Sequence, residues 1–235
     1  MRNNYLEQYV DLEGNVSDRN LVQQISIKTF AAIKFFSDRI LAIIGLIVAS
    51  PLMLIIAILI KLDSNGPVFF KQLRTGKYGK EFYMYKFRTM EKNNDVHDLS
   101  KADQHTRIGT FLRKTSLDEI PQLINILKGE MSFIGPRPWI PDYYEVMNEA
   151  QRFRNIVRPG ITGLAQTRGR NDIDIFKKIE YDLDYIKYYS LWMDLIVVTY
   201  TFIAVFGAKG ADAGKNNIER ELNDLKKQNK ISKNI

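Results

Sequence analysis

The feature that most constrains this chain is an uncharged run of 21 residues from Ile40 to Ile60, in which Ser50 is the only weakly polar residue. As a straight helix the run would be about 31 Å long, enough to cross a hydrocarbon core of about 30 Å. Pro51 stands at its midpoint, however, and proline bends or breaks a helix because it removes a backbone donor and clashes with the preceding turn. Each arm would then be about 15 Å long, which is too short to cross alone.

Positive charges lie at both ends of this run. Lys34 and Arg39 precede it, and Lys61, Lys71 and Arg74 follow it. A helix that crosses a membrane usually has its positive charges on one side, so this symmetry favours a helix-break-helix that enters and leaves one leaflet. A spanning helix with a proline kink is also common in membrane proteins. The residues alone leave both topologies open.

The overall composition narrows the partners and the chemistry. There are 34 Lys and Arg residues against 27 Asp and Glu, and the formal charge of +7 favours an anionic partner such as nucleic acid, lipid headgroups or a phosphorylated substrate. The absence of cysteine excludes disulfides, thiolate metal sites and a cysteine nucleophile. With His97 and His105 as the only histidines, a histidine-rich metal centre is not expected. The stretch from Met1 to Val10 lacks the pattern of a secretory signal.

Periodicity divides the chain into a polar extension (1–27), an apolar helix (28–62), a folded domain (63–206) and a linker with a Lys-rich tail (207–235). Two short strands around a Gly-Lys-rich turn, in VFFKQLRTGKYGKEFYMYKFRTM, predict a β-hairpin. The apolar run 195–206 predicts an amphipathic helix at a membrane interface, with a buried core helix as the close alternative. The tail is expected to be peripheral. Together these patterns predict an α+β fold that is mainly helical.

The window LRKTSLDEIPQ holds two adjacent carboxylates, Asp118 and Glu119, directly before Pro121. Ser116 and Glu119 match a capping box, and proline is tolerated in the first turn of a helix, so the two acids could simply begin a helix. On the local pattern alone this is the better interpretation. It does not exclude catalysis, because a helix N-terminus favours phosphate and an ionised carboxylate, and an ionised aspartate can attack phosphorus covalently.

Several arginines and a lysine stand where phosphate binding is possible. Arg137 lies between two prolines that restrict its backbone, and an arginine fork matches phosphate oxygens in bidentate fashion. Lys86 and Arg88 alternate with aromatic residues at strand period, and Arg168 and Arg170 lie in a glycine-containing segment. Each motif taken singly is equally typical of a solvated strand or an exposed turn. The chain has no Walker GxxxxGK[ST] and no GxGxxG pattern, which disfavours a P-loop enzyme and a dinucleotide fold.

Taken together, these windows resemble the bacterial sugar transferase family, the monotopic phosphoglycosyl transferases that begin lipid-linked glycan assembly. The resemblance runs from about Phe35 to Thr199 and is carried by four segments in order. They are SPLMLIIAILIKLDSNGPVFFKQLRTG, YKFRTM, RIGTFLRKTSLDEIPQLINILKGEMSFIGPRP and VRPGITGLAQTRGR, followed by YDLDYIKYYSLWMDL. The chain resembles the small form of the family.

The resemblance implies a re-entrant membrane helix broken at Ser50 and Pro51, followed by a cytoplasmic catalytic domain at 63–206 with interfacial amphipathic helices. It implies that Asp118 is the nucleophile and that Glu119 beside it helps to hold Mg²⁺ or to position a reacting group. The residues that match family positions near the phosphates, or that stand close to them, are Lys86, Arg88, Arg113 and Arg137. The candidates for the uridine contact are Arg168 and Arg170.

The resemblance also implies the substrates and the location. The donor would be a UDP-sugar, the acceptor undecaprenyl phosphate, the by-product UMP, and the site the cytoplasmic face of a bacterial inner membrane. Self-association through the C-terminal tail is possible, whereas nucleic acid is not expected because the cations lie in Gly-Pro turns. Two other functions stay open: a non-catalytic scaffold that binds anionic lipid, and a membrane-bound phosphodiesterase that transfers the group to water.

Overall fold

The computed structural model of the chain describes residues 21–91, 105–169, 173–206 and 218–233. The α-helices in these ranges are α2 (Leu21–Asp63), α3 (Arg107–Lys114), α4 (Gln122–Lys128), α5 (Pro141–Val146), α6 (Glu149–Arg152), α7 (Leu164–Gly169), α8 (Ile175–Lys187), α9 (Leu191–Phe206) and α10 (Ile218–Lys233). The short 3-10 helices are η1 (Lys77–Gly79), η3 (Leu117–Glu119) and η4 (Phe153–Asn155). The strands are β1 (Phe69–Thr75), β2 (Glu81–Phe87), β3 (Ser132–Ile134) and β4 (Gly160–Thr162). The predicted mainly helical α+β class is therefore confirmed.

The two small sheets carry the residues that follow. Strands β1 and β2 form the expected antiparallel hairpin, with Phe70 opposite Lys86 and Arg74 opposite Phe82. Directly opposite residues share a face of the sheet, and so do residues two or four apart in one strand. Lys86 and Arg74 therefore point to the same side. Strands β3 and β4 pair in parallel, with Ser132 opposite Gly160.

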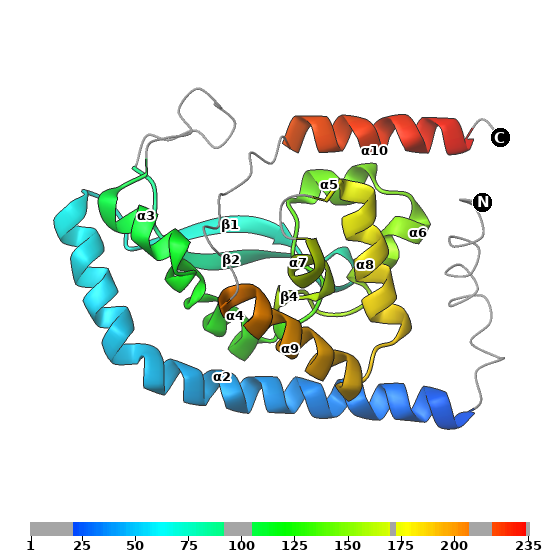
Figure 1. Cartoon of the computed structure of the whole chain (residues 1–235), viewed down its shortest axis with the longest axis horizontal. Helices are drawn as coiled ribbons and strands as arrows, with labels where there is room; N and C mark the ends of the chain where they lie inside the picture. The colour runs from blue at the N-terminus through cyan, green and yellow to red at the C-terminus, as the bar shows by residue number, and fades with distance from the viewer. Residues whose placement is uncertain (1–20, 92–104, 170–172, 207–217, 234–235) are drawn as a thin grey trace.

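Helix α2 continues through Pro51 and bends, where the sequence predicted a break. Pro51 has no N–H to donate to the carbonyl of Ile47, one turn earlier. The Ser50 hydroxyl donates to that carbonyl instead, at 2.8 Å, and so satisfies the group that the proline leaves free. Figure 1 shows α2 running beneath the other elements and then turning upward. The helix also begins at Leu21, earlier than the expected boundary at residue 28.

Both arms of α2 pack on the same domain. Ala42, before the bend, is buried against Met84 of β2 and Ile126 of α4. Ile56 and Ile60, beyond the bend, are buried in a second cluster with residues of β2 and α3. A helix whose two halves contact one compact domain wraps around that domain instead of leading away from it, as Figure 1 shows.

Polar contacts hold the two ends of α2 in the same way. Near its start, buried Lys34 donates to Asp194 of α9 at 2.6 Å, and buried Asp38 accepts from the Ser132 hydroxyl at 2.7 Å. At its end, Asp63 accepts from the backbone N–H of Ile108 at 3.0 Å. Buried polar side chains are costly unless they are paired, so these bonds fix where each arm lies.

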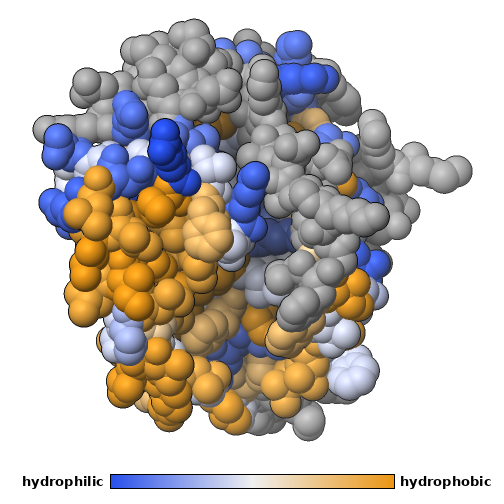
Figure 2. All heavy atoms as spheres, turned by 60° about the vertical axis from the view of Figure 1, so that its left-hand side comes forward, coloured by the Kyte–Doolittle hydropathy of each residue, from blue (hydrophilic) through white to orange (hydrophobic). Residues whose placement is uncertain are grey.

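The apolar surface of α2 is mostly uncovered. It is the one described helix that is long and apolar enough to cross a membrane, and only 11% of its most apolar window is buried inside the protein. The exposed side chains include Ile40, Ile44, Val48, Leu54 and Ile58. Figure 2 shows apolar residues gathered over the lower part of the face that carries the bend of α2, beneath a polar rim. A patch of this extent marks an interaction surface.

Helix α9 is also partly uncovered, with Leu191, Trp192 and Phe202 exposed and Val197 buried. Helix α10 is not the peripheral tail that the sequence predicted. Its Leu225 is fully buried in a cluster with Trp139 and residues of α5 and α8. The apolar side of α10 thus packs within the chain.

Candidate active site

The two adjacent acids lie in the short helix η3, between α3 and α4. Ser116, just before it, has a left-handed backbone (φ 57°, ψ 16°), and its side chain makes no capping hydrogen bond. Helix α4 begins only at Gln122, after Pro121. The capping-box interpretation is therefore wrong, because Ser116 does not have the extended backbone that such a cap requires. A non-glycine residue in this conformation stores strain, which tends to occur at functional sites.

Residues from three separate segments meet at these acids. The Lys86 ammonium of β2 lies 2.6 Å from Glu119 Oε1 and 3.5 Å from Asp118 Oδ2. The Arg137 guanidinium, from the loop after β3, lies 3.3 Å from the same Glu119 oxygen. We call Lys86, Asp118, Glu119 and Arg137 the charge cluster. The structure thus brings together four of the residues selected from the sequence, and the roles assigned to them stay predictions.

The two carboxylates of the charge cluster have different electrostatic surroundings. Burial alone would raise the pKa of Glu119, but Arg137 and Lys86 outweigh burial and lower it to about 2. Burial raises the pKa of Asp118, and Lys86 opposes this effect only in part, while the charge of Glu119 adds to it. Glu119 is consequently a fixed anion that holds two cations. Asp118 is less tightly paired, which leaves its oxygens freer to react.

Arg113, at the end of α3, is held by a histidine that the sequence did not single out for the site. Its Nη1 lies 2.9 Å from Nε2 of His105, whose Nδ1 lies 3.3 Å from the carbonyl oxygen of Thr89. Because arginine can only donate, Nε2 of His105 is the acceptor in this contact. The charge of Arg113 reaches Asp118 and opposes in part the rise in the pKa of that carboxyl that burial causes.

The loop that carries Arg137 is fixed at four successive carbonyl oxygens. The donors come from four different positions: Gly160 N to Pro136 (3.0 Å), Arg154 Nη2 to Arg137 (2.7 Å), Arg74 Nη1 to Pro138 (3.1 Å) and Thr75 N to Trp139 (2.8 Å). The prolines restrict φ on either side of Arg137 as well. The guanidinium therefore projects from a rigid backbone, as the sequence predicted, and its side chain remains 44% exposed.

Arg154 and Asp182 form a second ion pair, directly behind this loop. Two guanidinium nitrogens of Arg154 donate to Asp182 Oδ2, at 2.9 and 2.7 Å, and the guanidinium carbon lies 3.7 Å from the ring centroid of Trp139. The two side chains are 1% and 2% exposed. A buried pair of this kind tolerates the loss of neither partner.

Two of the described candidates lie elsewhere. Arg88 is buried just beyond the end of β2, and its guanidinium donates to the carbonyls of Ser64 and Asn65 at 2.7 and 3.0 Å, so it fixes the turn after α2 instead of facing a substrate. Arg168 is exposed and lies over the Tyr200 ring of α9, at 4.7 Å. Arg170 lies outside the described residues.

Sequence reasoning missed Arg74. Only its charge next to the apolar run drew notice, whereas in the hairpin it shares a sheet face with Lys86. The alternation of Gln72 and Arg74 along β1 is the signal that could have identified it.

The donor set suits a magnesium ion that also binds substrate. Among the described residues, no group of three or more His, Cys, Asp or Glu side chains could form a complete metal site. Magnesium usually takes one or two carboxylates and completes its octahedron with water and phosphate oxygens. Asp118 and Glu119 fit that mode.

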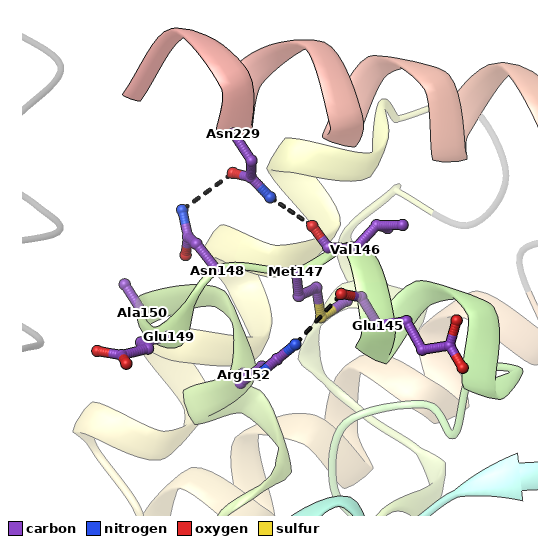
Figure 3. A pocket seen from close by; sticks show the side chains of 8 residues that line it. All are labelled: Glu145, Val146, Met147, Asn148, Glu149, Ala150, Arg152 and Asn229. Carbon is purple, nitrogen blue, oxygen red and sulfur yellow. Dashed lines mark hydrogen bonds between the residues drawn. The ribbon is translucent and has the colours of Figure 1, made fainter. Parts of the chain in front are cut away.

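A pocket of about 530 Å³ lies away from this chemistry, between the α5–α6 turn and α10. Figure 3 shows Asn229 reaching across it to Asn148 and to the carbonyl of Val146, and Arg152 bound to the carbonyl of Glu145. None of its lining residues belongs to the charge cluster. The pocket lies where α10 packs on the domain.

The sequence model of the bacterial sugar transferase family matches residues 29–208. The chain is 45% identical over 195 residues to the UDP-glucose:undecaprenyl-phosphate glucose-1-phosphate transferase of Xanthomonas campestris pv. campestris, covering 77% of this chain and 40% of that protein. It is 42% identical over 192 residues to the UDP-N-acetylgalactosamine-undecaprenyl-phosphate N-acetylgalactosaminephosphotransferase of Aeromonas hydrophila, covering 77% and 45%. It is 41% identical over 180 residues to the uncharacterized sugar transferase EpsL of Bacillus subtilis (strain 168), covering 76% and 89%. The chain thus spans less than half the length of the first two relatives and most of the third.

Proposed function

Because the chain belongs to the bacterial sugar transferase family, we propose that it is a phosphoglycosyl transferase that moves a phosphosugar from a UDP-sugar to undecaprenyl phosphate. The names of the Xanthomonas and Aeromonas relatives support these two substrate classes. The observation that carries the proposal is the charge cluster, in which a buried and loosely paired carboxylate, Asp118, lies among cations that suit a diphosphate.

The transfer would proceed in two steps. In the first, an oxygen of the Asp118 carboxylate attacks the sugar-proximal phosphorus, the bond from that phosphorus to the bridging oxygen breaks, and UMP leaves with the electron pair. In the second, an oxygen of undecaprenyl phosphate attacks the same phosphorus and frees the carboxylate. The lipid product carries a diphosphate and the sugar. Covalent catalysis of this kind divides one difficult displacement into two easier ones.

The cations of the site would support both steps in the same way. Lys86 and Arg137 lie within 3.5 Å of the carboxylates, so they are placed to bind phosphate oxygens and to offset the repulsion between Asp118 and the donor. Arg113 adds positive charge from the side of His105. A magnesium ion held by Asp118 and Glu119 would neutralise further charge on the diphosphate.

The shape of α2 supports a location on one face of the membrane, and the positive charges at both ends of its apolar run favour the cytoplasmic face. Lys34 and Asp38 on one arm, and Asp63 at the end of the other, contact the domain that holds Asp118. In a straight spanning helix the two ends would lie on opposite sides of the bilayer and could not reach one soluble domain. A bent helix that enters and leaves the same leaflet explains both the contacts and the exposed apolar surface.

The reaction is tested with the purified protein, a panel of UDP-sugars, Mg²⁺ and undecaprenyl phosphate, with UMP release as the measurement. Transfer requires that UMP accumulates beyond one equivalent per enzyme only when the lipid phosphate is present. Continued UMP release without the lipid would indicate a phosphodiesterase. If folded, membrane-bound protein releases no UMP with any donor, the protein is a scaffold.

The covalent intermediate has its own test, because a two-step reaction exchanges labelled UMP into the UDP-sugar when no lipid acceptor is present. Direct transfer between the two substrates would give no exchange.

The topology can be tested because the chain has no cysteine. We expect Lys28→Cys and Lys61→Cys, both at exposed positions of α2, to be shielded from a membrane-impermeant maleimide in intact spheroplasts and labelled after lysis. Asp142→Cys, exposed on α5, reports the side of the domain. Labelling of the Lys28→Cys variant alone in intact cells would show that the helix crosses.

A further inference from the structure

Arg74 is a largely buried cation beside the charge cluster for which the reaction described above has no use. Its guanidinium donates through Nη1 to the carbonyl of Pro138 at 3.1 Å and through Nη2 to Oε1 of Gln72 at 2.5 Å. Its Nε is buried, with no hydrogen-bond partner among the described residues. Pro138 directly follows Arg137, so one end of Arg74 is attached to the backbone that carries the exposed guanidinium of the site.

The position of Arg74 is electrostatically unfavourable on its own. Burial and the neighbouring charge of Arg137 lower the pKa of Arg74 to about 10, while Glu119 acts in the opposite direction. Glu119, however, is already shared between Lys86 and Arg137. A neutral donor could hold the Pro138 carbonyl equally well. The presence of a second cation, Arg74, close to Arg137 therefore needs a further reason.

An incoming anion would offset the repulsion between the two cations, and the planar guanidinium fork supplies the reason for an arginine here, because it joins Gln72 to Pro138. Four cations, Lys86, Arg113, Arg137 and Arg74, surround the two carboxylates Asp118 and Glu119 within electrostatic reach. The surplus of positive charge suits the diphosphate of a nucleotide-sugar. Arg74 holds the loop, while the side chain of Arg137 is 44% exposed and open to a ligand.

We propose that Arg74 is a positioning residue, which fixes the Pro138 carbonyl and thereby aims the Arg137 guanidinium at the diphosphate of the donor. This inference rests on the proposed function, since it names how that site holds its substrate. Arg74 acts through Arg137 and does not itself touch the reacting atoms. Its removal should therefore have no additional effect once Arg137 has been removed.

The test is a double-mutant cycle with Arg74→Met and Arg137→Met in the full-length protein, with kcat/KM for the UDP-sugar as the measurement. A misplacement of about 1 Å at a catalytic group can cost about 10²-fold, so we expect Arg74→Met to lower kcat/KM by about 10- to 100-fold. In the Arg137→Met background the same change should cost less than about 2-fold, since coupled residues are not additive. Lys80→Met, at the exposed turn of the same hairpin, is the matched control and should behave as the wild type.

Arg74→Lys separates position from charge, because lysine keeps the charge but lacks the planar fork that joins Gln72 to Pro138. We expect it to recover less than a tenth of the wild-type kcat/KM, and it also keeps the test available if Arg74→Met does not fold. Full recovery by lysine, or a full additional loss in the Arg137→Met background, would overturn the proposal.

Binding of UDP, measured by calorimetry, keeps the inference separate from the reaction. If the wild type transfers no sugar phosphate but Arg74→Met weakens UDP binding only when Arg137 is present, the proposed function fails and the positioning role stands. If UDP binding is the same in the wild type and Arg74→Met, the positioning role is overturned whatever the activity.

Discussion

The charge cluster and the Arg154–Asp182 pair are built from the same types of side chain but differ in how completely they are matched. In the buried pair, one carboxylate receives both bonds from one guanidinium, and the side chains are 1% and 2% exposed. In the cluster, one Glu119 oxygen serves two cations, Asp118 is held only at 3.5 Å, and Arg137 reaches solvent. The buried pair is closed to a ligand by its surroundings, whereas the cluster keeps the Arg137 guanidinium open to one. This difference is the reason to assign a structural role to the buried pair and to propose a reactive role for the cluster.

The largest effect is expected for a substitution of Asp118 in the charge cluster. We expect Asp118→Asn to reduce UMP release by at least about 10⁴-fold, since removal of a nucleophile leaves little of the catalysed rate. The fold should be retained, because asparagine has the same shape and the substitution removes a buried, loosely paired charge. Activity assays together with thermal unfolding check both parts. Asp142→Asn, at an exposed position of α5, is the control, and more than a tenth of the activity in Asp118→Asn would refute the nucleophile assignment.

Removal of one charged partner from the buried Arg154–Asp182 pair should instead reduce the stability of the fold. Arg154→Met leaves Asp182 buried without its partner, and breaking such a pair costs about 3–5 kcal/mol of unfolding free energy. It also removes the donor to the Arg137 carbonyl. Urea unfolding measures the loss. The double variant Arg154→Met/Asp182→Leu should be less destabilised than Arg154→Met alone, because no unpaired charge remains. A double variant that is less stable still would show that the pair does more than satisfy its own charges.

The pH dependence of the rate sharpens the contrast within the cluster. Burial raises the pKa of Asp118, so the ionised nucleophile is lost at a higher pH than for an ordinary aspartate, and the rate should fall as the pH falls. Lys86 opposes this shift, so Lys86→Met should move the acidic limb of the rate profile to higher pH and lower the maximal rate by about 10²-fold. Glu119, with a pKa of about 2, should not titrate in the assay range. An acidic limb that stays in place in Lys86→Met would contradict this account.

Local pattern in the sequence predicted much of the fold, whereas the resemblance to a known family selected the members of the cluster. Alternation along the strands placed Lys86, and the two prolines showed that Arg137 is rigid. Other features depend on contacts far along the chain. Arg88 turns inward because its guanidinium meets the carbonyls that follow α2, and α10 docks because Leu225 completes a core made by other helices. The predicted capping box does not form because the backbone of Ser116 is left-handed, and no residue pattern predicts that conformation.

The smallest effect is expected at an exposed ion pair whose N–O distance is close to that of the buried Arg154–Asp182 pair. Lys177 and Glu180 on α8 lie 2.8 Å apart, against 2.7 Å for Arg154 and Asp182, but their side chains are 41% and 44% exposed. Water screens an exposed pair, and its side chains lose entropy when they are held together, so Glu180→Gln should change the unfolding free energy by less than about 0.5 kcal/mol and leave UMP release unchanged. If urea unfolding showed a loss comparable to that of Arg154→Met, distance would set the strength of these pairs. A negligible loss would show that burial sets it, which is the principle behind the proposal that the half-buried, unevenly matched cluster at Asp118 is the reactive one.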